Sequence, residues 1–354
     1  MPESTLSLCQ VKSVDRAAHH PIVRDQPAVD FFEGALLGNG RLGAVVITRP
    51  DAVVIHFGHN NVWDIRIAEH SQETIGTFQE MFDRIKASPA DLASLDEFDW
   101  YQEYRQTIEA NYRKKPYPRP FPCGSLLLGF DRRQAELLGH RLDISTGLCE
   151  IHFLIEGKVA KLELFTDMSA DRLWLRLVGA NGDPKAAPFE RIRLMPDPDT
   201  PPDMPDFETA ADPTYNTLSF RQLLPFQEPH LYDPAIMHPK DCAFRLAVRT
   251  SDVFAPVTSQ TERFLKTEFI DSFAATRDES RQPRARRLEQ ILKPGSAFVA
   301  YVQLDEGLAS SIPPTAPQLP PPNQAAFESA AAASRRAWQD YWEQSGITIE
   351  DEFL

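Results

Sequence analysis

Residues 149–178 read CEIHFLIEGKVAKLELFTDMSADRLWLRLV, and this stretch decides the fold. In its middle, charged residues alternate with Leu162 and Leu164, as in a strand with one buried face and one solvent-facing side. Turn residues such as Glu156-Gly157 separate runs of strand length. These runs are Cys149–Ile155, Val159–Thr166 and Leu173–Val178. The stretch therefore predicts a meander of antiparallel strands.

Strand patterns extend on both sides of the meander. The hairpin nearest the N-terminus is joined by a Pro-Asp pair at residues 50–51, which favours a turn. The further predicted strands are Ala44–Ile47, Val53–Phe57, Leu126–Phe130, His140–Ile144, Cys242–Arg249 and Ser296–Leu304. So many strands with short turns predict a mainly β fold, a large antiparallel β super-sandwich over residues 1–310.

Two helical segments interrupt or follow the strands. A polar insertion at about residues 72–112 carries Ile75, Phe78, Phe82 and Ile85 at helical spacing, which predicts an amphipathic helix followed by a second one. The proline-rich residues 311–324 predict a stiff linker and a domain boundary. A helix at about residues 325–345 follows, in a final segment of residues 325–354.

The glycine-rich stretch Phe32–Val46 contains Gly38-Asn39-Gly40-Arg41-Leu42-Gly43. Its spacing fits a dinucleotide-binding loop, but a β-rich run follows it and not the helix that would bind the pyrophosphate. Asn-Gly supplies the positive φ angles of a tight hairpin turn. We therefore expect a structural turn here.

Composition excludes several classes of protein. The 51 acidic against 37 basic residues give a formal net charge of −14, which argues against a nucleic-acid partner. The four cysteines are widely spaced, so we expect reduced structural thiols and no metal site or cofactor. No signal peptide or membrane-spanning segment is visible, and we expect a cytoplasmic chain without membrane contact.

The densest polar and aromatic group consists of His59, Asn60, Asn61, Trp63 and Asp64. Such a group suits sugar binding, through stacking on the indole and hydrogen bonds to the amides. A structural role at an interdomain contact is the alternative. His19, His20 and His56 are further candidate ligands or proton carriers. By residue type, the candidates for a catalytic acid or base are the carboxylates Asp64, Glu69, Asp96, Glu97 and Asp99. The alternative is that they form a solvent-exposed acidic surface.

Three stretches resemble glycoside hydrolase family 95, the α-L-fucosidase and α-L-galactosidase group. The first is Leu36–Val46 with its LGNGRLG turn, followed by Asn60-Asn-Val-Trp-Asp64. The second pairs His140–Ile151 with Leu164–Leu173, and the third is the helix Ser334–Ile349. The run before Trp63 departs from the usual fucosidase pattern, which leaves the sugar preference open.

The resemblance implies an N-terminal β super-sandwich, linker helices and an (α/α) barrel that bears the catalytic residues. The parent enzyme would hydrolyse terminal α-glycosidic bonds with inversion, without metal or organic cofactor. The barrel would lie beyond Leu354, so no catalytic residue can be assigned here and the chain alone is expected to be inactive. Its expected partners are a carbohydrate and a missing or separately encoded barrel.

The last helix carries Trp338, Tyr341 and Trp342, more aromatic surface than water accommodates. We therefore expect an interdomain helix that packs on the barrel. A stand-alone carbohydrate-binding or scaffolding β-sandwich, whose last helix folds back on its own sheet, is the main alternative. A complete enzyme is the third possibility, and no convergent set of acid, base and oxyanion donors supports it.

Overall fold

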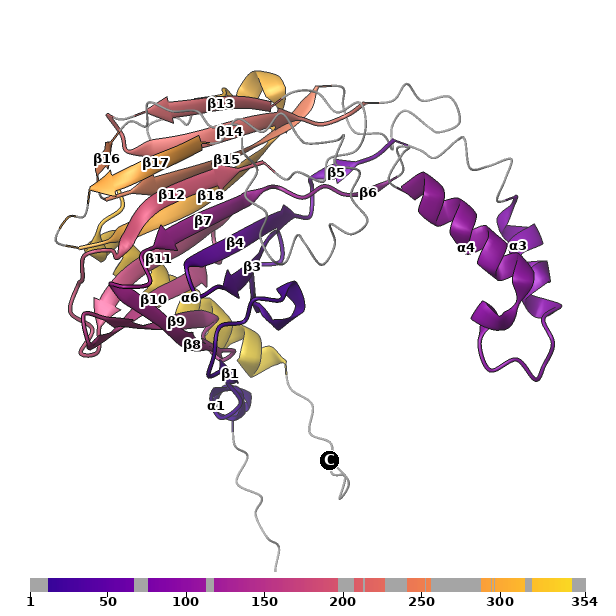
Figure 1. Ribbon diagram of the computed structural model, residues 1–354, viewed down its shortest axis with the longest axis horizontal. Coiled ribbons are helices and arrows are strands. Elements are labelled where there is room, and N and C mark those ends of the chain that lie inside the picture. The colour runs from indigo at the N-terminus through magenta and orange to yellow at the C-terminus, as the bar shows by residue number, and fades with distance from the viewer. Residues whose placement is uncertain are drawn as a thin grey trace, which may run out of the picture.

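The computed structural model describes residues 12–66, 76–112, 118–196, 207–212, 214–226, 241–251, 253–255, 288–293, 295, 297–315 and 320–345. Two large antiparallel sheets form most of the structure, and a pair of helices projects from one end (Figure 1). The mainly β fold that the strand patterns predict is confirmed. None of the described helices combines the length and the hydropathy of a membrane-spanning segment.

Sheet A has nine strands in the order β1-β8-β9-β10-β11-β18-β15-β14-β13. Strands β8 to β11 are neighbours both in the chain and in the sheet, so the predicted meander is confirmed. Strand β18 returns late in the chain and lies between β11 and β15. The bounds are β1 Ile22–Arg24, β8 Ala135–Asp143, β9 Leu148–Ile155, β10 Lys158–Thr166, β11 Arg172–Gly179, β13 Phe207–Asp212, β14 Thr217–Leu223, β15 Cys242–Thr250 and β18 Val299–Leu308.

Sheet B has seven strands in the order β16-β17-β12-β7-β4-β3-β2. The predicted hairpin is β3–β4, which closes at the pair Thr48 and Val53. Strand β7 does not join the meander, because it pairs with β4 and β12 in this second sheet. The bounds are β2 Ala35–Gly38, β3 Leu42–Thr48, β4 Ala52–His59, β7 Ser125–Phe130, β12 Phe189–Met195, β16 Val253–Ala255 and β17 Leu288–Lys293.

The main core lies between the two sheets. The alternation seen at Leu162 and Leu164 directs these side chains inward, and both are fully buried. Phe153 of sheet A meets Phe130 and Phe189 of sheet B, with ring centroids 5.4 Å and 6.1 Å apart. Burial of each such ring contributes about 2 to 3 kcal/mol, so aromatic contacts between the sheets are a main source of stability.

The insertion forms a helical arm, residues 76–112, with α3 (Phe78–Lys86), η2 (Leu95–Glu97) and α4 (Asp99–Tyr112). Thr77 and Glu80 form a capping box at the start of α3. The Arg84 guanidinium lies 5.8 Å from the Trp100 ring centroid, which links the two helices. No side chain described between residues 76 and 106 is buried. Both predicted helices are confirmed, yet the arm has no core of its own there.

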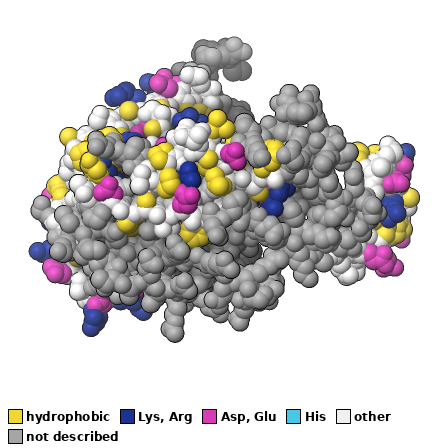
Figure 2. All heavy atoms as spheres, turned by 90° about the horizontal axis from the view of Figure 1, so that it is seen from above, with side chains coloured by type: hydrophobic (Ala, Val, Ile, Leu, Met, Phe, Trp, Pro, Cys, Tyr) yellow, Lys and Arg dark blue, Asp and Glu magenta, His cyan; other side chains and the backbone are white. Residues whose placement is uncertain are grey.

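The apolar side of α3 faces solvent. Phe78, Phe82 and Ile85 are 85%, 52% and 41% exposed. Figure 2, seen from above, has the arm at the right, with apolar, acidic and basic side chains together at its surface. The rest of the described surface in that view also mixes both signs of charge.

The segment after β18 lies across the outer face of sheet A. It starts with η4 (Ala309–Ser311), and we name residues 309–315 with Pro320 the strap. Carbonyl oxygens of the strap accept hydrogen bonds from Ser219, Arg221, Arg245 and Tyr301. The described part of the predicted linker is therefore held against the sandwich.

The last helix, α6 (Gln324–Gln344), begins at Asn323, whose side chain accepts a hydrogen bond from the Ala326 amide. It packs on the outer face of sheet A (Figure 1). Phe327 is 1% exposed, and its ring centroid lies 5.1 Å from that of Phe165. The remaining described elements are α1 (Ser13–Ala18), η1 (Phe31–Glu33) and the small sheet of β5 (Trp63–Asp64) and β6 (Arg119–Pro120).

Candidate functional site

The glycine-rich turn joins β2 to β3. The Asn39 amide donates to the Leu42 carbonyl, at an N···O distance of 3.2 Å. Gly40 has φ +87°, which favours glycine, and a Cβ there would meet nothing within 4 Å. Asn39 itself is not among the residues with positive φ. The predicted hairpin is confirmed, but the expectation that Asn39 supplies a positive φ is wrong, because it holds the turn through its side chain.

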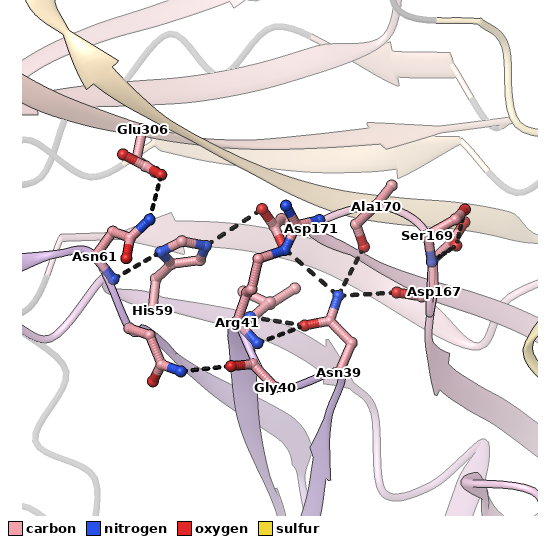
Figure 3. Close-up of polar contacts among 12 residues, drawn as sticks. Asn39, Gly40, Arg41, His59, Asn61, Asp167, Ser169, Ala170, Asp171 and Glu306 are labelled. Atoms are coloured by element: carbon pink, nitrogen blue, oxygen red, sulfur yellow. Dashed lines mark hydrogen bonds and ion pairs between the residues drawn. The ribbon is translucent and has the colours of Figure 1, made fainter. Parts of the chain in front are cut away.

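The Asn39 side chain fastens sheet B to sheet A (Figure 3). Its Nδ2 donates to the carbonyls of Asp167 at 2.9 Å and Ala170 at 3.0 Å, in the turn between β10 and β11. Its Oδ1 accepts from the amides of Arg41 and Leu42, both at 2.9 Å. One amide group thus closes its own hairpin and holds a turn 128 residues away.

Asp171 lies at the centre of the same corner. Its Oδ1 is 3.2 Å from Arg41 Nε, and its Oδ2 is 3.2 Å from His59 Nε2. The His59 side chain is fully buried, and its Nδ1 accepts a hydrogen bond from the Asn61 amide at 3.2 Å. Nδ1 is the acceptor in this contact, and Nε2 faces Asp171. The Nε2 contact lacks hydrogen-bond alignment, so it is a close polar approach.

The solvent side of the corner is formed by the residues after His59. Asn60 donates from Nδ2 to the Gly40 carbonyl, and Asn61 donates from Nδ2 to Glu306 Oε1 at 2.8 Å. Trp63 is 36% exposed, and its indole N–H donates to the Asn60 carbonyl at 2.5 Å. We name Asn39, Arg41, His59, Asn60, Asn61, Trp63, Asp171 and Glu306 the corner cluster.

Asp64 does not reach this surface. It is fully buried, with its Oδ1 3.0 Å from Arg66 Nε and its Oδ2 2.9 Å from Arg66 Nη2. Such a two-point pair is a strong charge-assisted contact that fixes the chain after β5. Of the five predicted sugar-binding residues, four therefore lie at the corner, and Asp64 has a structural partner beneath it.

The other candidates lie elsewhere. His19 and His20 are exposed beside α1, and Asp96, on the arm, is paired with Arg105 at 2.7 Å. Burial lowers the pKa of His56 to about 4. Its neighbours Val54 and Phe57 belong to the outer and inner sides of sheet B, so alternation puts His56 on the side opposite His59. Glu69 lies outside the described residues.

The described residues hold no group of three His, Cys, Asp or Glu side chains placed for a metal ion. Burial raises the pKa of the Cys149 thiol to about 12, so this cysteine is an inert part of the core. Cys123 is buried and Cys242 partly buried, and neither forms a disulfide within the described residues. Cys9 lies outside the described residues.

Near the end of α6, Trp338 and Trp342 also find contacts on the sandwich. Trp342 donates from Nε1 to the Ile144 carbonyl at 3.0 Å. Trp338 lies against Gly147, where an added Cβ would be 2.2 Å from the indole nitrogen. Tyr341 remains 52% exposed. An interdomain contact of this helix therefore has mainly the Tyr341 side available.

Asp171 and Glu306 are corner residues that residue-type reasoning did not select. Asp171 lies between the predicted strands Val159–Thr166 and Leu173–Val178, so its position indicates a turn. Nothing in the local sequence indicates that its carboxylate meets Arg41 and His59. Glu306 follows β-rich residues far along the chain, 245 positions from Asn61, and no local pattern connects the two.

Comparison with known proteins gives a family but no activity. A search of the curated proteins found no similar sequence. Among solved structures, a putative kojibiose phosphorylase from the human microbiome is 9% identical, with a TM-score of 0.34, over 91% of this chain and 34% of that one. A likeness at this level supports neither a shared fold nor a shared activity. The chain spans about a third of the length of that protein.

The family model for the N-terminal domain of glycosyl hydrolase family 65 matches residues 22–214, more than half of the chain. The resemblance to family 95 therefore pointed to the correct kind of domain, a glycoside hydrolase N-terminal region, and the matching family is 65. Fucosidase-type specificity gains no support from the match. The matched range includes the corner cluster except Glu306, and on this evidence the chain belongs to glycosyl hydrolase family 65 and contains its N-terminal domain.

Proposed function

We propose that the chain supplies the non-catalytic N-terminal β-sandwich of a glycoside hydrolase and packs on a catalytic (α/α) barrel in a further segment or a separate chain. The family match of residues 22–214 to an N-terminal domain carries this proposal. Asp171 at the corner is held by Arg41 and faces the buried side chain of His59. The Asp171 carboxylate thus has a structural role in the turn between β10 and β11. The catalytic acid and base of the reaction belong to the barrel.

The corner cluster is the proposed contribution to the substrate cleft. Asn39 holds both sheets together there, so the loop that follows β4 rests on a rigid support. That loop presents the half-exposed Trp63 ring beside the amides of Asn60 and Asn61. An indole face with neighbouring amides binds a sugar ring through stacking and hydrogen bonds.

The reaction of the parent enzyme is a finer part of the proposal. Hydrolysis of a terminal α-glycosidic bond with inversion is implied by the family-95 resemblance alone, and a fucosidase-like preference rests on the same stretches. The corner cluster supports contact with a carbohydrate and is equally compatible with several sugars and linkages.

The test uses the 354-residue chain alone and together with the product of the adjoining reading frame. We expect the chain alone to release no chromophore from aryl α-glycosides and the pair to be active. In the active pair, Trp63→Ala and Asn61→Ala should raise KM by about tenfold with little change in kcat, because they remove binding and leave the chemistry intact. Phe78→Ala, an exposed aromatic residue on the arm, is the matched control. Turnover by the pure chain that one substitution within it abolishes would overturn the proposal.

A stand-alone carbohydrate-binding sandwich is the second candidate, and the docking of α6 favours it. Trp338 and Trp342 are partly buried against the turn between β8 and β9, so part of their surface is shielded without a barrel. Calorimetry or a glycan array with the isolated chain separates the two functions. Binding that Trp63→Ala removes supports the binding module, and no binding by the isolated chain supports the domain of a larger enzyme.

A further inference from the structure

Four arginines lie on the outer face of sheet A, near the strap: Arg172 on β11, Arg221 on β14, and Arg245 and Arg249 on β15. Strand β15 is buried on both faces for nearly its whole length. Cationic side chains therefore lie on a face that is largely removed from solvent, where each guanidinium requires a partner.

Two of the four arginines have such partners. Arg221 donates to the carbonyls of Ala309 at 3.2 Å and Ile312 at 3.0 Å, and it pairs with Glu208 at 2.9 Å. Arg245 donates to two further carbonyls of the strap at 2.8 Å and pairs with Asp305 at 2.7 Å. These two arginines hold the strap on the sheet.

Arg249 is not neutralised. It is 7% exposed, and its Nε is shielded from solvent without a hydrogen-bond partner. Its guanidinium lies 5.6 Å from the ring centroid of Tyr215, a cation–π contact that carries no negative charge. Among the ion pairs of the described residues, none involves Arg249.

Arg172 is in a similar position. Its guanidinium lies 4.4 Å from the Tyr301 ring centroid and 5.5 Å from that of Trp174. Its Nη2 donates to the neutral Gln303 side chain at 2.6 Å, while its Nε is shielded without a partner. In the part of the chain that the structure describes, no carboxylate pairs with Arg172 either.

Tyr301 lies between these two arginines. It is opposite Arg249 in the pairing of β15 with β18, and the Arg172 guanidinium lies over its ring. Burial raises the pKa of Tyr301 to about 12, although both arginines act to lower it. The neutral hydroxyl donates to the Pro320 carbonyl at 2.7 Å. Tyr301 therefore does not supply the missing negative charge.

We propose that Arg249 and Arg172, on either side of Tyr301 beneath the strap, form a binding site for a phosphate group. Two guanidinium groups without carboxylate partners offer the fork-shaped donors that match the oxygens of an oxyanion. The chain has 51 acidic residues and is negatively charged overall, so two neighbouring arginines without a carboxylate partner are unusual in it. The site lies on the outer face of sheet A and does not depend on the proposed role of the corner cluster.

The first experiment measures binding of inorganic phosphate and of glycerol phosphate to the full chain by calorimetry, at constant ionic strength, with chloride as the control ion. We expect saturable binding that Arg249→Gln and Arg172→Gln each weaken by about tenfold or more. Arg176→Gln, which alters an arginine of β11 that already pairs with Glu163 and Glu328, should bind like the wild type. Binding of the ester alone indicates a phosphorylated small molecule, and binding of the free ion indicates an inorganic ligand.

A second experiment keeps the proposal falsifiable if a variant folds poorly. Arg249→Met should be as stable as the wild type or more stable in phosphate-free buffer, since it removes an unpaired buried cation. In saturating phosphate, the order should reverse, because only the wild type gains stability from the ligand. No saturable binding to the folded wild type, binding unchanged in both arginine variants, or no change in the order of stability would each overturn the proposal.

Discussion

Helices α6 and α3 both carry an apolar face, and only α6 has that face covered. Phe327 of α6 is 1% exposed among Phe165, Trp174 and Tyr301, whereas Phe78 of α3 is 85% exposed. Both helices were predicted from the same kind of spacing in the sequence. The difference teaches that amphipathic spacing indicates a helix with an apolar side, and that it does not indicate which surface covers that side.

The largest effect on this comparison should come from the docked helix. Phe327→Ala should lower the free energy of unfolding by about 3 to 4 kcal/mol, because it leaves a cavity between α6 and sheet A. Urea denaturation followed by tryptophan fluorescence measures the change. A loss below 1 kcal/mol would mean that α6 is not firmly docked in solution.

Asn39 tests whether the corner supports the same helix. The turn that Asn39 holds also carries the Met168 amide, which donates to Ser334 Oγ of α6 at 3.2 Å. Asn39→Ala removes five hydrogen bonds at a partly buried site, and we expect about 2 to 3 kcal/mol of destabilisation. Asn60→Ala, which loses one exposed side-chain contact, serves as the control. Equal losses in the two variants would contradict the central role of Asn39.

Acid should weaken sheet B without direct action on either helix. The pKa of His56 is lowered to about 4 in the folded chain, from 6.5. Its contribution to stability is therefore present above pH 6.5 and is lost as the pH falls toward 4, since the unfolded chain takes up the proton first. At pH 5 the loss is about 2 kcal/mol relative to pH 8. The pH dependence of unfolding should be shallower in His56→Gln, and an unchanged slope would exclude His56 as the cause.

Gly147 measures the contact of α6 at its aromatic end. Its φ is +68°, and an added Cβ would overlap the Trp338 indole. Gly147→Ala should cost about 2 kcal/mol, from backbone strain together with displacement of Trp338. Gly157→Ala is a matched control, because φ is +75° there and nothing lies within 4 Å of the added Cβ. A larger loss of unfolding free energy in Gly147→Ala than in Gly157→Ala measures the contact with Trp338. Equal losses in the two variants would contradict that contact.

The smallest effect is expected on the arm. Phe82→Ser in the isolated chain should change the free energy of unfolding by less than about 0.5 kcal/mol, since the ring is 52% exposed and packs in no core. Thermal unfolding and sedimentation of the variant check this. A loss of 2 kcal/mol or more would show that the arm buries this face in solution and would remove the contrast with α6.

The sequence alone determined the secondary structure to a large extent. Alternation at Leu162 and Leu164, turns at Glu156-Gly157 and helical spacing in residues 325–345 are local signals, because each depends on neighbours within a few positions. The hairpin at Gly38–Gly43 followed in the same way. Resemblance of short stretches also led to a glycoside hydrolase N-terminal domain, although to family 95 and not to family 65.

Only the tertiary structure decided which distant residues meet. Asn39 holds Asp167, Asn61 reaches Glu306, and β7 enters sheet B and not the meander. The two side-chain contacts join segments more than 100 residues apart, and the place of β7 depends on a choice between two sheets of similar composition. The local periodicity of the sequence indicates neither. The same reason explains why Trp338 and Trp342 lie against the turn between β8 and β9, and why Arg249 is buried without a carboxylate. Burial and pairing are properties of the packed molecule, because each depends on every element that approaches the side chain.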